Sequence, residues 1–317
     1  MRTGGGSPVI AERKSLLGIR ELAPEEIVEI LDSAESFREV LDRSVKKVPA
    51  LRGTTIANLF FENSTRTRSS FELAEKRLSA DVLNFSASGS SVAKGETLRD
   101  TAQNIEAMNV DIIVMRHGSS GACHFLDRQV RARVVNAGDG LHEHPTQALL
   151  DAFTLRETLG KIEGLRVVIL GDISHSRVAR SNIFLLTKLG ARVTVCGPPT
   201  MLPPEVESLG VTATTDVRAA LRDADAVNVL RIQFERQAEP LIPGIREYAD
   251  HFGISEAKLA DIPDGITVLH PGPMNRGTEI SHEVAELHAD TILRQVSNGV
   301  AVRMAVLYLL SGAGGAN

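Results

Sequence analysis

The order of apolar segments along the chain is the feature that most narrowly limits its fold. Short apolar runs, which predict buried strands, alternate with longer stretches whose apolar residues recur at helical spacing. Strands separated by helices in this way indicate βαβ units and a parallel sheet. Strands are predicted at Ile56–Phe61, Val82–Phe85, Asp111–Met115, Val134–Ala137, Arg166–Leu170, Arg192–Cys196, Ala226–Leu230 and Ile266–Leu269. Helices are predicted at Pro24–Val40, Arg66–Leu78, Glu96–Met108, His124–Arg131, Thr146–Thr158, Arg177–Leu189, Asp216–Arg222 and Gly299–Leu310.

The strand and helix pattern restarts near the middle of the chain. The helix Thr146–Thr158 ends at Gly160, and a new strand begins at Arg166. A chain of 317 residues is also longer than the usual single domain of about 100–200 residues. We therefore predict an α/β protein with two doubly wound parallel-sheet domains and an active site in the cleft between them. The pattern leaves open which half the last helix, Gly299–Leu310, packs against.

Composition and charge exclude several classes of protein. The hydrophobic content of 43% and charged content of 24% fit a soluble globular protein. A net charge of −5, with no basic run longer than Lys46-Lys47, gives no reason to expect nucleic-acid binding. The start of the chain has no apolar signal region, and Arg303 interrupts the most apolar segment, so no membrane association is expected. Cys123 and Cys196 form no CxxC motif, which fits a reducing cytoplasm.

Polar residues follow six of the predicted strands, where each strand ends. In open parallel sheets, ligands bind beyond the carboxyl ends of the strands. Arginine and hydroxyl side chains at these positions suit a small polyanion. The segments are "ENSTRTR" after Phe61, Arg116-His117 after Met115, "GDGLHEHPTQ" after Ala137, "GDISHSRVAR" after Leu170, "RIQFER" after Leu230 and "HPGPMNRG" after Leu269.

The segment "STRTR" at Ser64–Arg68 has two interpretations. Ser64 or Thr65 could cap the following helix, with Arg66 and Arg68 in solvent. Alternatively, the hydroxyls, the guanidinium groups and the N–H groups at the helix start bind a phosphate. Side chains would then hold the anion, which explains the absence of the glycines that usually let a backbone approach phosphate. We favour phosphate binding.

Other motifs argue against common cofactors. "GDISHSR" has one glycine and does not match G-x-G-x-x-G, and no G-x-x-x-x-G-K-[ST] occurs, so neither nicotinamide nor a Walker-type nucleotide site is expected. "LHEHPTQ" raises the question of a metal, but no set of four ligands at a recognised spacing appears, and we predict no metal. The histidines and cysteine considered are His117, His124, His142, His144 and Cys123. His144 is better interpreted as a neutral hydrogen-bond donor to a carbonyl oxygen.

The Ser/Gly-rich segment Ser88–Asp100 also allows two interpretations. It could be a mobile surface loop, or it could deliver the charge of Lys94 to a site by loop closure. The pattern alone leaves both open.

Taken together, these motifs resemble the aspartate/ornithine carbamoyltransferase family. The resemblance extends from Leu16 to Leu310 and includes "FENSTRTRSSFE", "SVAKGETLRDT", "MRH", "HEHPTQALLD", "SRVARSN", "RIQFER" and "LHPGPMNRGTEI" in this order. "STRTR" and "HPTQ" mark the whole family, whereas "RIQ" and "HPGPMNRG" resemble its aspartate-specific branch. Ornithine-specific members typically carry a cysteine in an "HCLP" loop, where this chain has His270–Pro273.

The resemblance implies a particular reaction and implies that each domain binds one of the two substrates. In the aspartate-specific branch the amino group of L-aspartate attacks the carbonyl carbon of carbamoyl phosphate, giving N-carbamoyl-L-aspartate and phosphate in pyrimidine synthesis, without a cofactor. Residues 1–148 would bind carbamoyl phosphate and residues 149–296 would bind aspartate. Residues 297–317 would pack back on the first domain.

The resemblance also implies roles for individual residues. Carbamoyl phosphate would contact Ser64, Thr65, Arg66, Thr67, Arg116, His144, Gln147, Gly272 and Pro273, and L-aspartate would contact Lys94, Arg177, Arg231 and Gln233. Arg116, His144 and Thr67 would polarise the carbamoyl oxygen. Ser90 and Lys94 would come from a neighbouring subunit, which implies a homotrimer with shared active sites. Regulatory chains or dihydroorotase subunits in a larger assembly remain open.

Two other functions also remain open from the residues alone. The chain could carbamoylate a different amine, or it could be a non-catalytic subunit that kept the fold. The presence of every matched polar residue favours an active enzyme.

Overall fold

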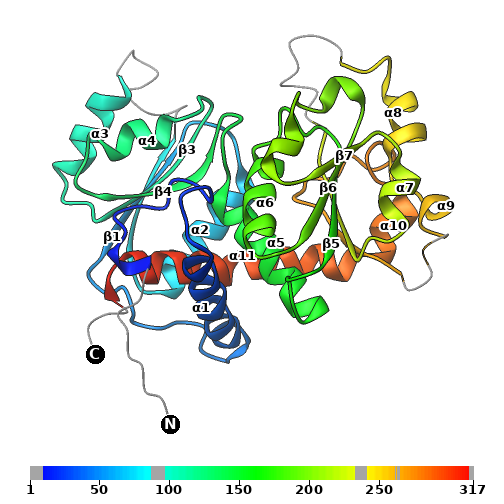
Figure 1. Cartoon of the computed structure of the whole chain (residues 1–317). Coiled ribbons are helices and arrows are strands. Elements are labelled where there is room, and N and C mark those ends of the chain that lie inside the picture. Colours follow the sequence, from blue (N-terminus) through cyan, green and yellow to red (C-terminus); the bar gives the residue numbers. More distant parts are fainter. Residues whose placement is uncertain (1–9, 87–96, 233–240, 261, 263–264, 314–317) are drawn as a thin grey trace. The chain divides into compact units, whose positions relative to one another are not determined.

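The chain folds into two compact units. The computed structural model describes residues 10–86, 97–232, 241–260, 262 and 265–313 (Figure 1). Unit 1 comprises Met1–Leu149 together with Asn298–Asn317, and unit 2 comprises Leu150–Ser297. Helices α5 (Pro145–Leu159) and α11 (Ala289–Leu310) each contribute residues to both units. The last helix, which the sequence pattern could not place, therefore belongs to unit 1 from Asn298 onward.

Unit 1 is built on a parallel sheet with the strand order β2-β1-β3-β4. The strands are β1 (Thr55–Phe60), β2 (Asp81–Ser86), β3 (Ile112–His117) and β4 (Arg133–Asp139). The helices are α1 (Pro24–Asp42), α2 (Thr65–Arg77), α3 (Leu98–Glu106) and α4 (Ala122–Asp127), and a 3-10 turn at Ile10–Glu12 precedes them. All four strands predicted for this half are confirmed, within one or two residues at their ends.

Helices from distant parts of the chain cover this sheet. Apolar residues of β1, β3 and β4 pack against α3 and α4, which lie beside β3 and β4 in Figure 1. Helix α2 is joined to α11, because Arg303 Nη1 donates a hydrogen bond of 2.8 Å to Ser70 Oγ. The same guanidinium lies 5.0 Å from the centre of the Phe71 ring. The arginine of the apolar last helix is therefore buried within unit 1, where its guanidinium contacts Ser70 and Phe71 of α2.

Unit 2 is built on a second parallel sheet, with the order β7-β6-β5-β8-β9. The strands are β5 (Arg166–Leu170), β6 (Arg192–Cys196), β7 (Thr212–Thr214), β8 (Ala226–Val229) and β9 (Thr267–Leu269). The helices are α6 (Arg177–Lys188), α7 (Val217–Leu221), α8 (Ile245–Phe252), α9 (Glu256–Leu259) and α10 (His282–Leu287), with 3-10 turns at Pro199–Met201 and Val206–Leu209. The prediction of two parallel α/β sheets is thus correct.

The elements that the sequence pattern missed have weak apolar signals. Strand β7 is three residues long and has the sequence Thr-Ala-Thr, so no apolar alternation marks it. Helix α8 buries only Tyr248, and α9 buries no residue. Helix α11 begins at Ala289 and not at the predicted Gly299. The prediction missed its first turns because most of their side chains are exposed and give no apolar periodicity. Short or surface helices bury too little apolar area to be visible as a periodic pattern.

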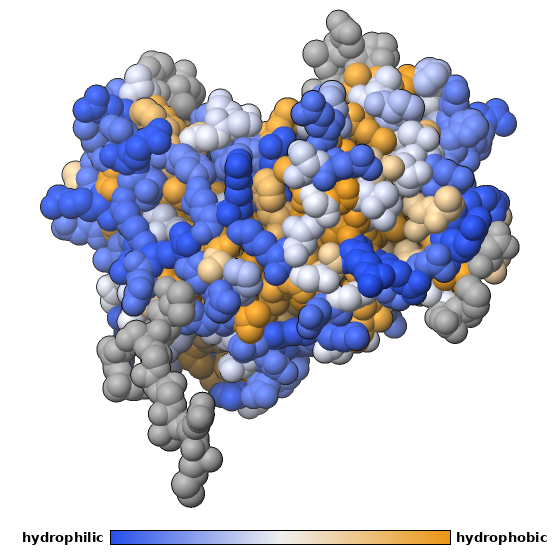
Figure 2. Space-filling model, viewed as in Figure 1, coloured by the Kyte–Doolittle hydropathy of each residue, from blue (hydrophilic) through white to orange (hydrophobic). Residues whose placement is uncertain are grey.

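The visible surface mixes hydrophilic and hydrophobic residues, with hydrophilic ones in the majority (Figure 2). Leu287 of α10, 71% exposed, and Leu293 of α11, 64% exposed, are among the most exposed large apolar residues. Apolar atoms contribute much of the surface of any folded domain, so single exposed leucines are ordinary. Within the described residues, no helix has both the length and the apolar character needed to cross a membrane.

A buried carboxyl group lies between α2 and the sheet of unit 1. Glu75 of α2 is fully buried, and its Oε2 accepts a hydrogen bond of 2.8 Å from Asn58 Nδ2 of β1. Asn58 Nδ2 also donates to Asn84 Oδ1 of β2, at 3.2 Å. Among the described residues Glu75 Oε1 accepts no hydrogen bond. Burial raises the pKa of Glu75 to about 8, and the hydrogen bond from Asn58 only partly opposes that rise.

Replacing Glu75 with glutamine is expected to remove a pH dependence of stability. The unfolded chain releases this proton near the ordinary pKa of 4.5, whereas the folded chain keeps it to about 8. The free energy of unfolding therefore falls as pH rises from 4.5 to 8 and is level above. E75Q should be more stable than the wild type by about 1–3 kcal/mol at pH 8 and by less at pH 6. Urea unfolding at both pH values measures the difference. Arg38→Gln, a change on helix α1 at a side chain that pairs with Asp42, is the control. A pH-independent difference for E75Q would contradict the expectation.

Candidate active site

The start of α2 is an open helix N-terminus at the carboxyl end of β1. Ser64 occupies the N-cap position, but its side chain makes no capping hydrogen bond. Thr65 and Arg66 in the first turn are exposed, and Thr67 is 9% exposed. Ser64 is therefore the N-cap residue by position, but its hydroxyl does not cap the helix. The helix start carries hydroxyls, N–H groups and a guanidinium in one turn, and donors of these kinds suit an anion such as phosphate.

Arg116 lies at an irregularity near the end of β3. The pairing of β3 with β4 shifts register between Met115 and His117. Where such a shift is a β-bulge it changes the direction of a side chain, and bulges are frequent beside active sites. Arg116 Nε lies 3.3 Å from Glu62 Oε2, and its Nη1 donates to Ala137 O at 3.2 Å. The guanidinium is thus fixed between the ends of β1 and β4.

His117, the next residue, is held as a neutral imidazole. Its Nδ1 accepts a hydrogen bond of 2.9 Å from Ser119 N, and its ring packs on Phe61 with 5.2 Å between ring centres. Burial lowers the pKa of His117, although Glu62 and Asp139 nearby oppose the shift. At neutral pH the positive charge at this strand end therefore belongs to Arg116.

The end of β4 carries His144 and Gln147. His144 is 4% exposed and immediately precedes α5, and Gln147 in the first turn donates its backbone N–H to His144 O. The preceding Glu143 is buried, and its Oε2 accepts a hydrogen bond of 2.7 Å from Ile19 N. This contact anchors the loop that leads to His144.

Asp139, the last residue of β4, is also buried and anionic. Burial by itself would raise the pKa of Asp139, but hydrogen bonds from His142 and Asn136 outweigh that effect and lower it. Its carboxylate additionally accepts a hydrogen bond of 3.2 Å from Glu143 N. Asp139 therefore fixes the turn between β4 and α5.

Unit 2 places two arginines at strand ends of its own sheet. Arg177 is the first residue of α6, after β5, and is 3% exposed. Ser176 caps that helix, because its Oγ accepts a hydrogen bond of 3.1 Å from Ala179 N. Arg231 follows β8, one residue past Leu230, whose N–H donates to Leu170 O of β5. Both guanidiniums thus lie at the carboxyl edge of the sheet.

The loop after β9 is organised by a buried histidine and a buried glutamate. His270 Nδ1 accepts a hydrogen bond of 2.8 Å from Gly272 N, so Nε2 carries the ring proton and donates to Glu279 Oε1 at 3.2 Å. Glu279 Oε1 also accepts from Asn275 N, and Asn275 Nδ2 donates to Ile232 O at 3.1 Å. The loop that bears Gly272-Pro273, joined by a cis peptide, is thereby tied to the segment after β8.

A second buried carboxylate connects four elements of unit 2. Asp151 Oδ2 accepts hydrogen bonds from Asn182 Nδ2 at 2.9 Å and from Asn228 Nδ2 at 3.0 Å. Its Oδ1 accepts from Gln295 Nε2 at 2.8 Å, and Gln295 Oε1 accepts from His270 N at 2.9 Å. A single aspartate therefore links α5, α6, β8 and α11 beneath the strand ends that carry Arg231 and His270.

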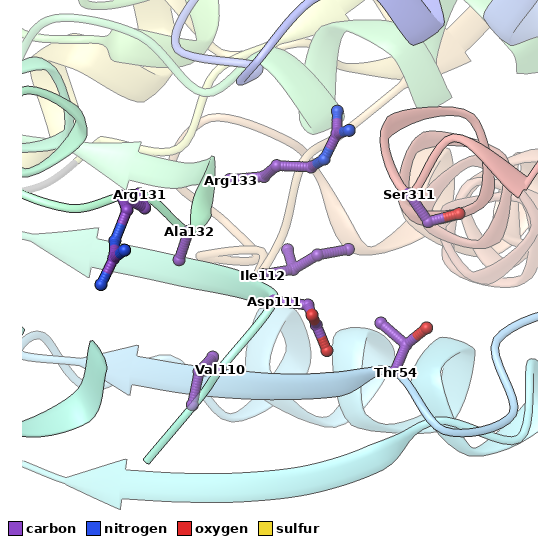
Figure 3. A pocket seen from close by; sticks show the side chains of 8 residues that line it. All are labelled: Thr54, Val110, Asp111, Ile112, Arg131, Ala132, Arg133 and Ser311. Carbon is purple, nitrogen blue, oxygen red and sulfur yellow. The ribbon is translucent and has the colours of Figure 1, made fainter. Parts of the chain in front are cut away.

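A cavity of about 390 Å³ lies at the opposite edge of the unit 1 sheet. Figure 3 shows its lining at the amino-terminal ends of β3 and β4, where Arg131 and Arg133 extend in different directions. Arg133 Nη1 donates to Arg13 O, and Arg131 lies beside Glu106. Because the two guanidiniums do not converge, the cavity lacks the donor cluster seen at the carboxyl edge.

Three of the predicted site residues, Ser90, Lys94 and Gln233, lie outside the described residues. Within unit 1 the structure gathers Ser64–Thr67, Arg116, His144 and Gln147 at the carboxyl ends of β1, β3 and β4. Within unit 2 it gathers Arg177, Arg231 and Gly272-Pro273 at the ends of β5, β8 and β9. Sequence analysis missed the groups that hold these residues in place, namely Glu62, Asp139, Glu143, Asp151, Asn275, Glu279 and Gln295. Five of these residues are acidic and lie inside the quoted motifs, so an acidic residue within a motif was the sequence signal that could have identified them.

Two domain models of one enzyme family match the chain, in the order of its two halves. Residues 14–157 match the carbamoyl-phosphate-binding domain of the aspartate/ornithine carbamoyltransferases, and residues 163–310 match their aspartate/ornithine-binding domain. The chain therefore belongs to the aspartate/ornithine carbamoyltransferase family.

Several similar relatives within that family carry the aspartate-specific name. The chain is 59% identical over 299 residues to the aspartate carbamoyltransferase catalytic subunit of Cytophaga hutchinsonii, covering 94% of this chain and 97% of that one. It is 57% identical over 301 residues to the catalytic subunit of Halothermothrix orenii, covering 95% and 96%. Among solved structures, the aspartate transcarbamoylase of Trypanosoma cruzi with N-(phosphonacetyl)-L-aspartic acid superposes with a TM-score of 0.87 at 29% identity, covering 95% and 96%.

Proposed function

We propose that this chain is the catalytic chain of an aspartate carbamoyltransferase. It transfers the carbamoyl group of carbamoyl phosphate to the amino group of L-aspartate, and the products are N-carbamoyl-L-aspartate and phosphate, in pyrimidine biosynthesis. Relatives that share more than half of the sequence bear this name over nearly their whole length. Solved structures of the Trypanosoma cruzi enzyme contain carbamoyl phosphate, alone or with aspartate.

The observation that carries the assignment is the uncapped start of α2. Ser64, Thr65, Arg66 and Thr67 would bind the phosphate, because the N–H groups of this first turn are not used by the Ser64 side chain. Charge-assisted hydrogen bonds from arginine and a helix N-terminus hold phosphate well.

The carbamoyl group would lie between β3 and α5. Arg116 and His144, with Thr67, would donate hydrogen bonds to the carbamoyl oxygen, and Gln147 would contact the NH2 group. The Gly272-Pro273 backbone would contact the carbamoyl nitrogen. Arg116 is held by Glu62 and Ala137, so its donors are oriented before substrate binds, which is the condition for strong transition-state stabilisation.

Aspartate would bind through its two carboxylates. Arg177 and Arg231, together with Gln233 and Lys94, would pair with them, and arginine is suited to this because its donors match a carboxylate in pairs. We further propose that residues 1–148 form the carbamoyl-phosphate domain with residues 297–317 packed on it, that residues 149–296 form the aspartate domain, and that the site lies in the cleft between them.

The reaction then needs no covalent intermediate on the protein. The aspartate nitrogen attacks the carbonyl carbon, the C–O bond to phosphate breaks, and phosphate leaves with the bonding electron pair and accepts the proton that the amine loses. The carbonyl oxygen gains negative charge in the transition state, and Arg116 and His144 would stabilise that charge. Holding two anions side by side supplies the rest of the rate enhancement.

We also propose a cytoplasmic homotrimer in which Ser90 and Lys94 complete the site of the neighbouring subunit. Mixing Lys94→Ala subunits with Arg66→Ala subunits should restore part of the activity, because some sites in such hybrids receive both intact residues. Absence of any recovery would contradict shared sites.

The test of the proposed function is a colorimetric assay for ureido products. With carbamoyl phosphate, L-aspartate should be converted at a rate far above that with L-ornithine, because two arginines would bind a second carboxylate and would repel a cationic side chain. Equal rates, or conversion of ornithine alone, would refute the aspartate assignment. No product with either amine would favour the non-catalytic alternative.

A further inference from the structure

Two histidines and a carboxylate meet at the end of β4, apart from the proposed substrate-binding groups. They are His124 of α4, Asp139 of β4 and His142 of the following loop. Each can offer one nitrogen or oxygen ligand atom, and these atoms all lie within 4.8 Å of one another. The ring centres of His124 and His142 are 5.2 Å apart, at an angle of 73° between the rings.

The separations suit a tetrahedral transition-metal ion. Zn²⁺ binds nitrogen and carboxylate oxygen at about 2.0–2.2 Å, so two ligand atoms on one tetrahedron are roughly 3.3 Å apart. Asp139 Oδ1 lies 3.1 Å from His142 Nδ1, which is already close to the separation of two ligand atoms on one metal ion. Two imidazoles on one such ion would have ring centres about 5 Å apart by the same geometry. The ion would replace the proton that Asp139 and His142 now share.

The surrounding groups hold these side chains in place. Asp139 Oδ2 accepts a hydrogen bond of 2.7 Å from Gly121 N, and its Oδ1 accepts one of 2.7 Å from Asn136 Nδ2. His124 Nε2 lies 2.6 Å from Glu21 Oε1, so a second carboxylate orients that ring. Carboxylates and backbone groups that orient the ligands are characteristic of protein metal sites.

Charge and access also favour a divalent cation. Glu21 and Asp139 supply two negative charges, and two neutral imidazoles supply none, so a divalent ion is balanced. The side chains of His124 and His142 are 28% and 30% exposed, which lets an ion enter from solvent while Asp139 stays buried.

We propose that His124, Asp139 and His142 form a binding site for a divalent transition-metal ion of the Zn²⁺ type, with Glu21 as the outer carboxylate. The ion joins the segment before α1, helix α4 and the loop that leads to His144. It therefore stabilises unit 1 and takes no part in carbamoyl transfer. Glu21 and His124 lie far in the sequence from Asp139 and His142, which is why no ligand spacing was visible in the sequence.

The test is titration of the tag-free protein with Co²⁺, followed by visible absorption. About one Co²⁺ per chain should bind, with the intense bands of four-coordinate cobalt, and Zn²⁺ should displace it. His124→Ala and His142→Ala should each weaken binding at least about tenfold, and Glu21→Gln should weaken it by about tenfold.

His175→Ala is the matched control. His175 Nδ1 also lies 2.9 Å from an aspartate three residues away, Asp172, and its side chain is similarly exposed at 32%. No second histidine is grouped with it among the described residues. Binding should be unchanged in this variant. Absence of Co²⁺ binding to the wild type, or equal binding by the His124→Ala/His142→Ala double variant, would overturn the proposal. Because the wild type itself is measured, misfolding of a variant cannot hide a negative result, and neither result depends on carbamoyl transfer.

Discussion

Replacing Arg66 with alanine is expected to abolish measurable turnover while the chain still folds. Arg66 is exposed in the first turn of α2, so its removal leaves no cavity in the core of unit 1. The phosphate would lose its main cationic partner, and carbamoyl phosphate would be neither held nor polarised. The loss of kcat/KM should exceed 10³-fold, or about 4 kcal/mol of transition-state stabilisation.

Steady-state kinetics with saturating aspartate, together with circular dichroism, measures this effect. Lys76→Ala is the matched control, since Lys76 is an exposed basic residue at the other end of the same helix and its side chain pairs with Glu72 at 2.7 Å. That variant should keep near-native activity. A near-native rate in Arg66→Ala would refute phosphate binding at the start of α2.

Replacing Arg116 with alanine is expected to lower kcat by 10²- to 10³-fold, or about 3–4 kcal/mol. The guanidinium would contact the carbamoyl oxygen most strongly when that oxygen carries negative charge, so kcat should fall much more than the KM for aspartate rises. Rapid-mixing measurement of a single turnover separates the chemical step from product release.

The Glu62 carboxylate provides the comparison for Arg116. Glu62→Gln keeps a hydrogen-bond acceptor beside Arg116 Nε but removes the ion pair of 3.3 Å. The loss of kcat in this variant should be about tenfold or less, because the guanidinium itself remains. If Arg116→Ala mainly raised the KM for aspartate and left kcat unchanged, a role at the carbamoyl oxygen would be ruled out.

Long buried elements were predictable from the sequence, and short exposed ones were not. Strands β1, β3, β5 and β8 are mainly apolar, since parallel strands are covered on both faces. Strand β7 and helix α8 bury few apolar side chains, and their signals were lost among loop residues. The sequence could not place the last helix, because an apolar face packs equally well against either sheet. In the structure, the contact of Arg303 with Phe71 shows that this helix packs on unit 1.

The sequence by itself determined which chemical groups the chain could bring to a ligand. Residue type fixes charge and hydrogen-bonding capacity, and the position after a strand fixes which edge of a parallel sheet a residue occupies. Only the tertiary structure decided which residues form hydrogen bonds and ion pairs with the predicted site residues and so fix their side chains. The contact of Arg116 with Glu62, the hydrogen bonds to Asp151 and the grouping of His124 with His142 all join residues far apart in the chain. Such contacts depend on packing in three dimensions, and no local pattern of residues records them.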